Sequence, residues 1–248
     1  MKVIIIAAGY GSRLGNLTKN TPKGLLKING KSILERQINL FHSKKISEIN
    51  IITGPHKKFG LPDISYINDK NYDEHDVLGS LMAAKNIIHG KIITSYSDIL
   101  FEEKILDQLL NFKGDIGIPI DLDWEKYYEG RTQHPKSEAD NVLLKNNQII
   151  EIKKNIIPKN NDEIIGEFLG PMVFSERGSE IFVKYYEKLE QSIHGKFHNA
   201  PSLKKAYLTD MIQELIKKNI HIDPIIIDGN WCEIDTPQDL IRAEKLFN

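Results

Sequence analysis

Two glycines and two cations follow the first apolar run of the sequence. Val3 to Ile6 is an unbroken β-branched run, which predicts a strand buried on both faces. Gly9 and Gly11 come next and let backbone N–H groups approach a ligand closely, while Arg13 and Lys23 add positive charge at two different reaches. Backbone donors and separated cations suit a triphosphate, whose charge is spread over several oxygens. We therefore predict a nucleotide site at the end of the first strand.

Two better-known glycine motifs do not fit this loop. A dinucleotide fingerprint requires G-x-G-x-x-G, but its third position falls on Leu14, and Gly15 comes one residue late. The phosphate-loop pattern G-x-x-x-x-G-K-[ST] does not occur in the sequence. For the glycines alone, a tight turn with solvated cations is an open alternative.

Two aspartates stand where a metal ion could bind. Asp98 directly follows a strand predicted over 91–95, and Asp235 precedes the last predicted helix. Mg²⁺ favours one or two carboxylates together with substrate phosphates, so the pair predicts a Mg²⁺ site. Helix capping near Glu102 is the alternative for Asp98, and an extra cap or a salt-bridge partner is the alternative for Asp235.

The N-terminal loop as a whole resembles the signature of the sugar-nucleotidyltransferase superfamily. It reads A-A-G-x-G-[ST]-R-L followed by T-x-x-x-P-K. These enzymes move a nucleoside monophosphate from a nucleoside triphosphate to a phosphorylated acceptor. The resemblance implies that Asp98 and Asp235 hold the metal. It also implies nucleotide contacts from Ala7, Ala8, Gly9, Gly11, Ser12, Arg13 and Lys23.

Two later segments resemble one branch of that superfamily, the phosphocholine, phosphonate and phosphoglutamine cytidylyltransferases. They are Glu-Ile-Asp-Thr-Pro-Gln-Asp-Leu at 233–240 and Tyr-Leu-Thr-Asp at 207–210. In this branch the segment matching 76–81 meets the cytosine, which implies Asp76 and Ser80 as nucleotide-binding residues. Asp76-Val77 replaces the usual adjacent asparagines, so the choice between CTP and UTP stays open.

The resemblance also supplies candidates around the reacting phosphates. Lys154 matches a lysine that approaches them in relatives and joins Arg13 and Lys23 as a catalytic cation, with Lys153 as the alternative. Glu167 and Asp210 match acidic positions that face the acceptor. A polar surface face would explain these two carboxylates equally well.

The segment 124–135 is rich in aromatic residues and carries Arg131, one of few arginines in the chain. Arginine offers a planar fork to a phosphate or a carboxylate, so we expect Arg131 and Tyr128 to bind the acceptor. Long loops of this kind are often functional lids, although an ordinary packed surface loop is the alternative. His134 has no second histidine or cysteine at metal spacing and is expected to be polar lining at most.

Strand and helix alternate through the first half of the chain. Strands are expected at 49–53, 65–68, 91–95, 116–120, 168–174 and 225–227, with a hairpin over 142–152. Helices are expected after Ser32 and Thr236, over 77–88 and within 203–218. This order predicts an α/β fold: a doubly wound, mainly parallel, Rossmann-like sheet. We expect a single domain over 1–248 with a substrate-facing insertion at about 121–165.

Composition narrows the class of protein. The net charge of −1 gives no reason to expect a nucleic-acid or membrane partner. A single cysteine, Cys232, fits a reducing compartment, and the first apolar run is too short for a signal or membrane helix. We expect a cytoplasmic monomer or homodimer.

Together these observations predict a cytidylyltransferase that transfers CMP from MgCTP to a small head-group phosphate or phosphonate. The acceptor would be of the phosphocholine, aminoethylphosphonate or phosphoglutamine type, for decoration of a surface polysaccharide or lipid. A sugar-1-phosphate nucleotidyltransferase is the alternative, and a non-catalytic nucleotide-binding subunit is a third.

Overall fold

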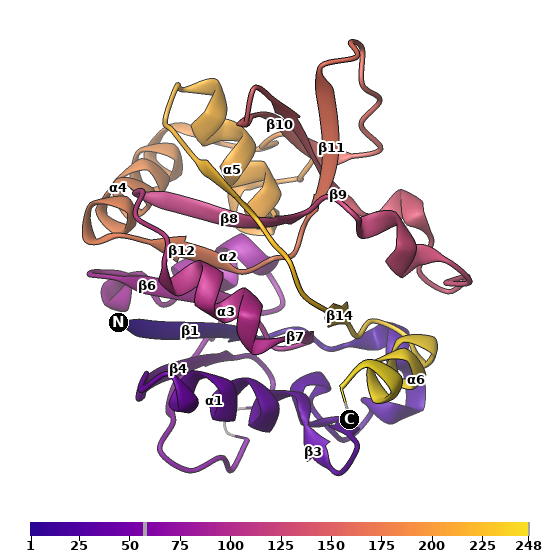
Figure 1. Cartoon of the computed structure of the whole chain (residues 1–248). Helices are drawn as coiled ribbons and strands as arrows, with labels where there is room; N and C mark the ends of the chain where they lie inside the picture. The colour runs from indigo at the N-terminus through magenta and orange to yellow at the C-terminus, as the bar shows by residue number, and fades with distance from the viewer. Residues whose placement is uncertain (57–58, 248) are drawn as a thin grey trace.

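The β-branched run at the N-terminus lies at the centre of a parallel sheet. In the computed structural model, which describes residues 1–56 and 59–247, strand β1 (Lys2–Ala7) pairs in parallel with β4 (Glu48–Thr53) and β6 (Ile92–Tyr96). On its far side β4 pairs in parallel with β5 (Ser65–Asn68). Val3, Ile4 and Ile5 have no exposed surface, as expected for a strand covered on both faces (Figure 1).

The second half of the chain extends this sheet mostly with antiparallel strands. The path through the described strands is β10-β9-β11-β8-β12-β6-β1-β4-β5, and β13 pairs with β8 beside it. The added strands are β8 (Ile116–Asp121), β9 (Asp140–Lys145), β10 (Gln148–Lys154), β11 (Glu163–Phe168), β12 (Met172–Phe174) and β13 (Asp223–Ile226). Two small sheets pair β2 (Lys27–Ile28) with β3 (Lys31–Ser32) and β7 (Ile99–Phe101) with β14 (Trp231–Glu233).

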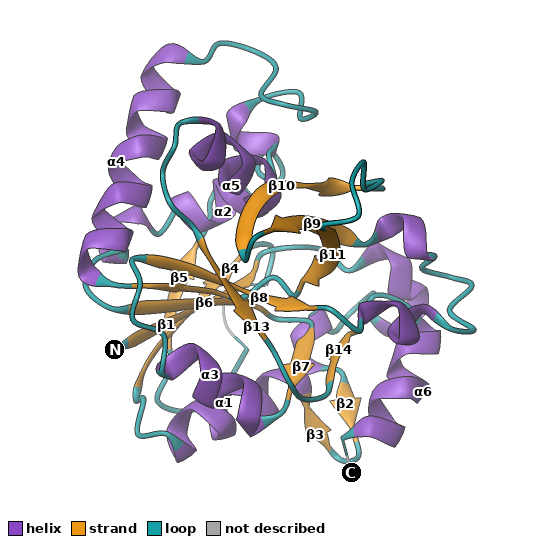
Figure 2. Ribbon diagram, turned by 45° about the horizontal axis from the view of Figure 1, so that its top comes forward, coloured by secondary structure: helices purple, strands orange, loops and turns teal. Residues whose placement is uncertain are grey.

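Helices cover both faces of the sheet, which confirms the doubly wound α/β fold (Figure 2). Val3 and Ile5 pack with α1 (Ile33–Ser43) and α3 (Glu103–Leu110), whereas Ile4 and Ile6 face α2 (Val77–Met82), α4 (Glu176–Ser192) and α5 (Leu208–Lys217). α6 (Pro237–Leu246) packs through Ala243 against the two small sheets. Short 3₁₀ turns lie at Ser12–Leu17, Lys23–Leu25, Lys85–Ile87, Trp124–Tyr128, Lys136–Glu138 and Leu203–Lys205.

Local sequence signals explain several element boundaries. Ser32 and Glu35 form the predicted capping box of α1, and Thr236 caps α6 ahead of Pro237. The predicted hairpin joins β9 to β10 through Asn146 and Asn147, whose φ angles are 50° and 58°. Asparagine tolerates this left-handed conformation, which a two-residue hairpin turn requires.

Three element predictions were wrong in detail. The strand expected over 168–174 is two strands, because Gly170, at φ 101°, and Pro171 turn the chain between them. The helix expected over 77–88 stops at Met82 and resumes as a short 3₁₀ turn. The helix expected within 203–218 begins only at Leu208, and Tyr207 before it is 54% exposed. The long helix α4 was not predicted.

The polar segment expected as an irregular loop after residue 121 has its own small core. Trp124 and Tyr128 meet edge to face at 5.7 Å between ring centroids and pack with Ala139. The strands that follow join the main sheet, so this part of the chain continues the fold.

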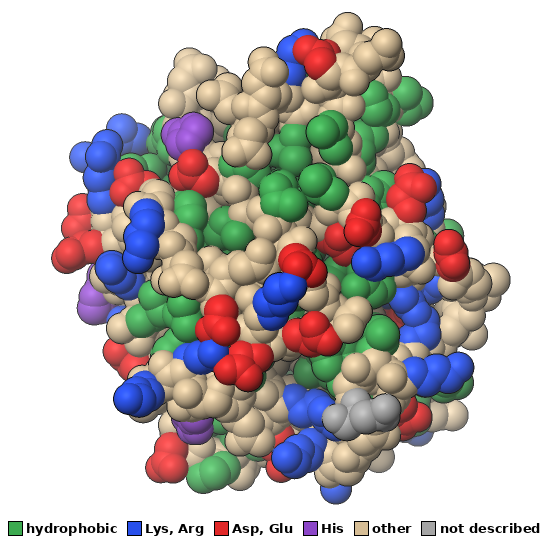
Figure 3. Space-filling model, viewed as in Figure 1, with side chains coloured by type: hydrophobic (Ala, Val, Ile, Leu, Met, Phe, Trp, Pro, Cys, Tyr) green, Lys and Arg blue, Asp and Glu red, His purple; other side chains and the backbone are tan. Residues whose placement is uncertain are grey.

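The surface carries charges of both signs. On the face shown in Figure 3, lysine and arginine side chains alternate with acidic ones and form no broad single-sign area. None of the described helices is long and apolar enough to cross a bilayer.

Candidate active site

A large cleft opens along the carboxyl ends of the parallel strands. Its volume is about 1510 Å³, and its wall includes the loop after β1, Asp98 after β6, and the start of α2. In open α/β sheets, ligands bind at this edge of the sheet. Strands β9 to β11 and the segment around Tyr207 supply the opposite wall. Most of the residues that the sequence singled out thus meet in one cleft, although they lie far apart in the chain.

A buried lysine lies between the two predicted metal ligands. Lys23 Nζ is 2.7 Å from Asp98 Oδ2 and 2.5 Å from Asp235 Oδ1. Burial alone would lower the pKa of Lys23, but the two carboxylates outweigh it and raise the pKa above its usual value. The alternative of a solvated loop cation does not fit, because only 11% of this side chain is exposed.

The capping alternatives for the two aspartates are not supported. At α6, the carboxylate of Asp239 accepts the cap hydrogen bonds, from the Thr236 N–H at 2.9 Å and the Thr236 hydroxyl at 2.8 Å. At α3, Glu102 occupies the N-cap position. Neither Asp98 nor Asp235 therefore serves as a helix cap. The salt-bridge alternative for Asp235 stands beside the metal role, because this carboxylate pairs with Lys23 and Arg13.

The aspartate pair fits a hard divalent cation. Both carboxylates contact Lys23, and the buried Asp98 Oδ1 has no hydrogen-bond partner among the described residues. Mg²⁺ prefers oxygen ligands and binds through one or two carboxylates with substrate phosphates and waters. A divalent ion held by these aspartates would give Asp98 Oδ1 a partner.

His134 lies against the metal-site aspartate, which the sequence did not reveal. Its Nδ1 is 2.9 Å from Asp235 Oδ2, and Arg13 Nη1 approaches the same oxygen at 3.0 Å. The hydrogen bond from His134 and the charges of Lys23 and Arg13 outweigh the effect of burial and hold the pKa of Asp235 well below its usual range. One ligand atom each from His134, Glu233 and Asp235 lie within 4.8 Å of one another, so this side could also contribute to a cation site. The sequence analysis looked for a second histidine or cysteine near His134. It therefore missed the carboxylates of Glu233 and Asp235, which lie beside His134 in the fold.

The predicted nucleotide loop has the expected backbone geometry. Gly11 has φ 65°, and the hydroxyl of Thr18 donates to its carbonyl oxygen at 2.8 Å, which holds the loop in place. A Cβ at Gly11 would lie 3.2 Å from Lys23 Cβ. The cleft wall includes Ala8, Gly9, Gly11, Ser12, Arg13, Asp76 and Ser80, whereas Ala7 is the last residue of β1 and does not line it.

Both candidate lysines of β10 line the cleft, but their partners differ. Lys154 Nζ donates to Glu138 Oε2 at 2.6 Å, and Glu138 lies close enough to Arg13 and His134 for their charges to lower its pKa. Lys153 Nζ instead pairs with Glu151 of its own strand at 2.6 Å. The contacts of Lys154 thus connect it to the cation cluster.

Two of the expected acceptor residues, Glu167 and Asp210, line the cleft, and a third, Tyr128, lies outside it and hydrogen-bonds to Glu167. Glu167 is 4% exposed, its Oε2 has no hydrogen-bond partner in the described part of the chain, and burial raises its pKa to about 8. The buried Tyr128 donates its hydroxyl to Glu167 Oε1 and does not reach the cleft wall. Asp210 lines the cleft and also accepts from the Tyr207 N–H at 2.9 Å, at the start of α5.

Arg131 is not placed to contact an acceptor, contrary to expectation. Its side chain is 2% exposed, lies outside the cleft wall, and donates from Nε to Asp239 Oδ1 at 2.7 Å. The guanidinium also lies 5.1 Å from the ring centroid of Tyr128. The guanidinium of Arg131 is therefore engaged within the protein, where it joins the 124–135 segment to α6.

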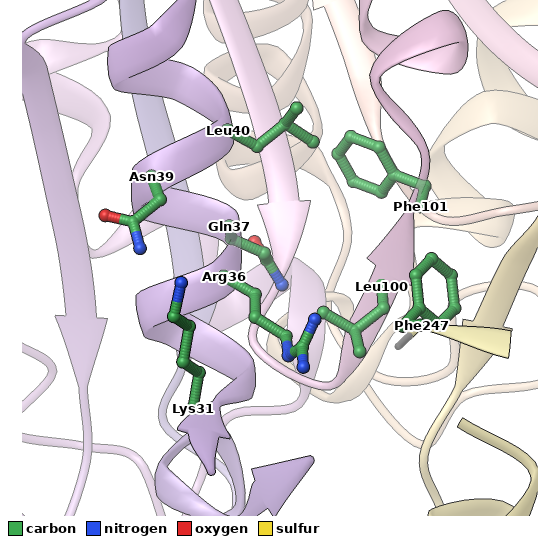
Figure 4. Close-up of a pocket in the computed structure, with 8 residues that line it drawn as sticks. All are labelled: Lys31, Arg36, Gln37, Asn39, Leu40, Leu100, Phe101 and Phe247. Atoms are coloured by element: carbon green, nitrogen blue, oxygen red, sulfur yellow. The ribbon is translucent and has the colours of Figure 1, made fainter. Parts of the chain in front are cut away.

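A smaller hollow lies away from this cleft, beside α1. Its volume is about 270 Å³, and Figure 4 shows Arg36 near the apolar side chains of Leu100 and Phe247. Both Nε and Nη2 of Arg36 donate to the Ile28 carbonyl, at 3.1 and 2.7 Å. The guanidinium is already engaged, and we assign no chemistry to this hollow.

Comparison with known proteins identifies the family of this chain. Residues 3–121 match the model of the MobA-like NTP transferase domain. Over 269 aligned positions the chain is 31% identical to the CTP:phosphoglutamine cytidylyltransferase of Campylobacter jejuni, covering 99% of this chain and 100% of that protein. This chain belongs to the nucleotidyltransferase family. It is accordingly an enzyme, and the resemblance inferred from its motifs is confirmed.

Solved structures show the same fold. The chain matches a putative glucose-1-phosphate thymidylyltransferase from Bacillus anthracis with TM-score 0.73 and 20% identity, covering 99% of this chain and 94% of that one. It matches the CTP:phosphocholine cytidylyltransferase from Streptococcus pneumoniae with TM-score 0.69 and 21% identity, covering 100% and 99%. At these identities the likeness extends to the fold alone.

Proposed function

We propose that this nucleotidyltransferase moves CMP from CTP to a small head-group phosphate or phosphonate that also carries a cationic or amide group. The observation that carries the proposal is one cleft that brings two kinds of group together. Lys23, Arg13 and two aspartates line it, and so does the buried carboxyl of Glu167, whose Oε2 has no hydrogen-bond partner among the described residues. The full-length likeness to a CTP:phosphoglutamine cytidylyltransferase supports the same substrate class.

The reaction is an in-line displacement. An acceptor phosphate oxygen forms a bond to the α-phosphorus, and the bond from that phosphorus to the bridging oxygen breaks, so pyrophosphate leaves with the electron pair. A phosphate monoester is already largely dianionic at neutral pH, with a second pKa of about 6, and needs no general base. Positioning and charge stabilisation are the enzyme's main tasks.

The cations of this chain suit those tasks. Lys23 is held between two carboxylates and presents a fixed positive charge beside the loop of Gly9 and Gly11. Arg13, whose side chain is 58% exposed, can bind phosphate oxygens in the cleft, and Lys154 can approach from β10. Mg²⁺ held by Asp98 and Asp235 would supply further neutralisation of phosphate charge when bound.

The acidic wall favours an acceptor with a hydrogen-bond donor. Burial favours the protonated form of Glu167 in the free enzyme, and its ionised form would repel a dianionic phosphate unless it met a cation or an N–H group. Glu167 Oε2 is buried and unpaired in the described structure, so an ammonium or amide group of the acceptor would give it a partner.

A pyrophosphate-release screen tests this proposal. Four nucleoside triphosphates are crossed with phosphocholine, aminoethylphosphonate, phosphoglutamine and a set of sugar 1-phosphates, each with and without Mg²⁺. We expect turnover with CTP and a head-group acceptor only in the presence of the metal. Preference for a sugar 1-phosphate would overturn the proposal in favour of a sugar nucleotidyltransferase.

A further inference from the structure

A histidine that the sequence did not single out lies at one end of the cleft. The strand order β6-β1-β4-β5 sets the strand ends in a row, from Asp98 after β6, past the loop after β1, to Asp69 after β5. Neighbouring strands are about 4.8 Å apart, so the β5 end lies a nucleoside's length from the phosphate-binding end. His75, Asp76 and Ser80 line the cleft there.

Two aromatic side chains border the same end. Tyr10, from the loop after β1, and Tyr72 both line the cleft, and their ring centroids are 5.6 Å apart. Aromatic faces suit stacking against a nucleobase. The site for the base therefore lies beside His75 if the phosphates lie at Lys23.

A buried carboxylate fixes the ring of His75. Asp69 is 1% exposed, and each of its carboxylate oxygens is 3.0 Å from His75 Nδ1. Ser80 Oγ donates to Asp69 Oδ2 at 2.9 Å, and the Asn71 N–H donates to Oδ1 at 3.0 Å. A carboxylate oxygen accepts the hydrogen bond, so Nδ1 carries a proton, and in the neutral imidazole Nε2 is then the acceptor.

The second ring nitrogen is available to a ligand. The hydrogen bonds of His75 within the described residues all involve Nδ1, and the side chain keeps 9% exposure at the cleft wall. Close packing fixes the ring further, because a Cβ at Gly79 would lie 2.9 Å from His75 Cγ. Ser80 donates to Asp69 and not to the histidine, so the three residues are not a nucleophilic triad.

We propose that His75 reads the nucleobase by accepting a hydrogen bond from an exocyclic amino group, and so selects cytosine over uracil. The inference rests on the proposed cytidylyl transfer and assigns its base specificity. Cytosine presents an amino donor at the position where uracil presents a carbonyl oxygen. Against uracil, the lone pair of Nε2 would face a second acceptor, which leaves both groups unpaired and costs binding.

Another histidine of the cleft provides a matched control. His198 also meets a carboxylate, with Nε2 3.1 Å from Glu214 Oε2, but its Nδ1 lies 3.5 Å from Lys217 Nζ. Both of its ring nitrogens therefore have a partner, and no acceptor is left for a base.

The test compares CTP, UTP and the 2-pyrimidinone triphosphate, which lacks only the exocyclic amino group of CTP. Binding of each nucleotide is measured by calorimetry without acceptor, so the readout does not depend on turnover. We expect wild type to prefer CTP, and His75→Ala to lose about 10-fold of that preference, the effect of one hydrogen bond. Asp69→Asn should lose part of it, because the ring is no longer fixed, whereas His198→Ala should keep it.

Thermal melting of each variant checks that it is folded. If Asp69→Asn does not fold, the result for His75→Ala, at the cleft wall, still tests the proposal. An unchanged CTP preference in His75→Ala, or an equal loss in His198→Ala, overturns the base-reading role. Failure of the proposed function is a separate result, since it would appear as wild-type turnover with a sugar 1-phosphate in the acceptor screen.

Discussion

At the scale of single residues, Lys23 combines catalysis with stability. Lys23→Ala should lower the rate of pyrophosphate release about 10²-fold or more, because one preorganised charge contact is lost. The variant should also be less stable without metal, because Asp98 loses its paired cation, whereas Asp235 keeps Arg13 and His134. Steady-state kinetics and thermal melting measure the two effects. Near-normal kinetics in a folded variant would contradict the catalytic assignment.

The two aspartates should act as one unit. Asp98→Asn and Asp235→Asn should each abolish Mg²⁺-dependent turnover, and the double variant should be little worse than either, because residues that act through one metal are non-additive. Mg²⁺ titration of initial rates provides the measurement. If Asp235→Asn kept both its activity and its Mg²⁺ requirement, that carboxylate would serve only to hold Lys23, Arg13 and His134.

At the scale of elements, Arg131 was expected to bind the acceptor but instead connects two parts of the fold. Its guanidinium joins the 124–135 segment to the fully buried Asp239 of α6. Arg131→Ala should destabilise the fold by about 3–5 kcal/mol, because it leaves a buried carboxylate without its closest cation. Arg242→Ala is the matched control: Arg242 lies 3.8 Å from the same carboxylate and is 22% exposed, so its loss should cost much less.

Urea unfolding of both arginine variants tests this difference. Equal stability losses would show that Asp239 does not depend on Arg131. A raised KM for the acceptor in a fully stable Arg131→Ala enzyme would restore the original assignment to substrate binding.

Elements with a strong local signal were predictable from sequence. The β-branched run of β1, the Ser32 capping box and the asparagine turn at 146–147 each fix the local backbone, and each is present. The break at Gly170 and the start of α4 also have local signals, the Gly170-Pro171 pair and the Ser175 N-cap, which the prediction did not use. Arg131 shows a different limit, because nothing near it in the sequence indicates that Asp239 is its partner.

The site residues that belong to a recognisable sequence motif were predictable from the sequence. Lys23, Asp98 and Asp235, which the motifs singled out, lie together in the fold. The carboxylate partners of His134 and His75 were not predicted: Asp235 meets His134 only through the fold, and the six-residue spacing of Asp69 and His75 is not a known motif. Neither histidine has a characteristic spacing to a second metal ligand or catalytic group, so composition and periodicity do not identify it.

At the scale of the whole molecule, the acidic wall should make stability depend on pH. Burial raises the pKa of Glu167 to about 8 in the folded state, against about 4.3 in an unfolded chain. Between these two values the folded state binds a proton that the unfolded state does not. The contribution of this group is therefore fully present below about pH 4.3 and is lost as the pH rises through about 8, with a slope of at most about 1.4 kcal/mol per pH unit.

Glu167→Gln removes this titration while keeping a neutral, hydrogen-bonding side chain. Its unfolding free energy should therefore fall less than that of wild type between pH 5 and pH 8, as measured by urea unfolding at several pH values. Glu163→Gln, on the same strand, is the control: hydrogen bonds from the Lys159 N–H and Asn160 lower the pKa of Glu163, so its titration ends below that window. Parallel pH profiles for wild type and Glu167→Gln would mean that Glu167 is ionised in the free enzyme. In that case the acidic wall would bear a fixed negative charge before the acceptor binds, and only a cationic acceptor group could neutralise it.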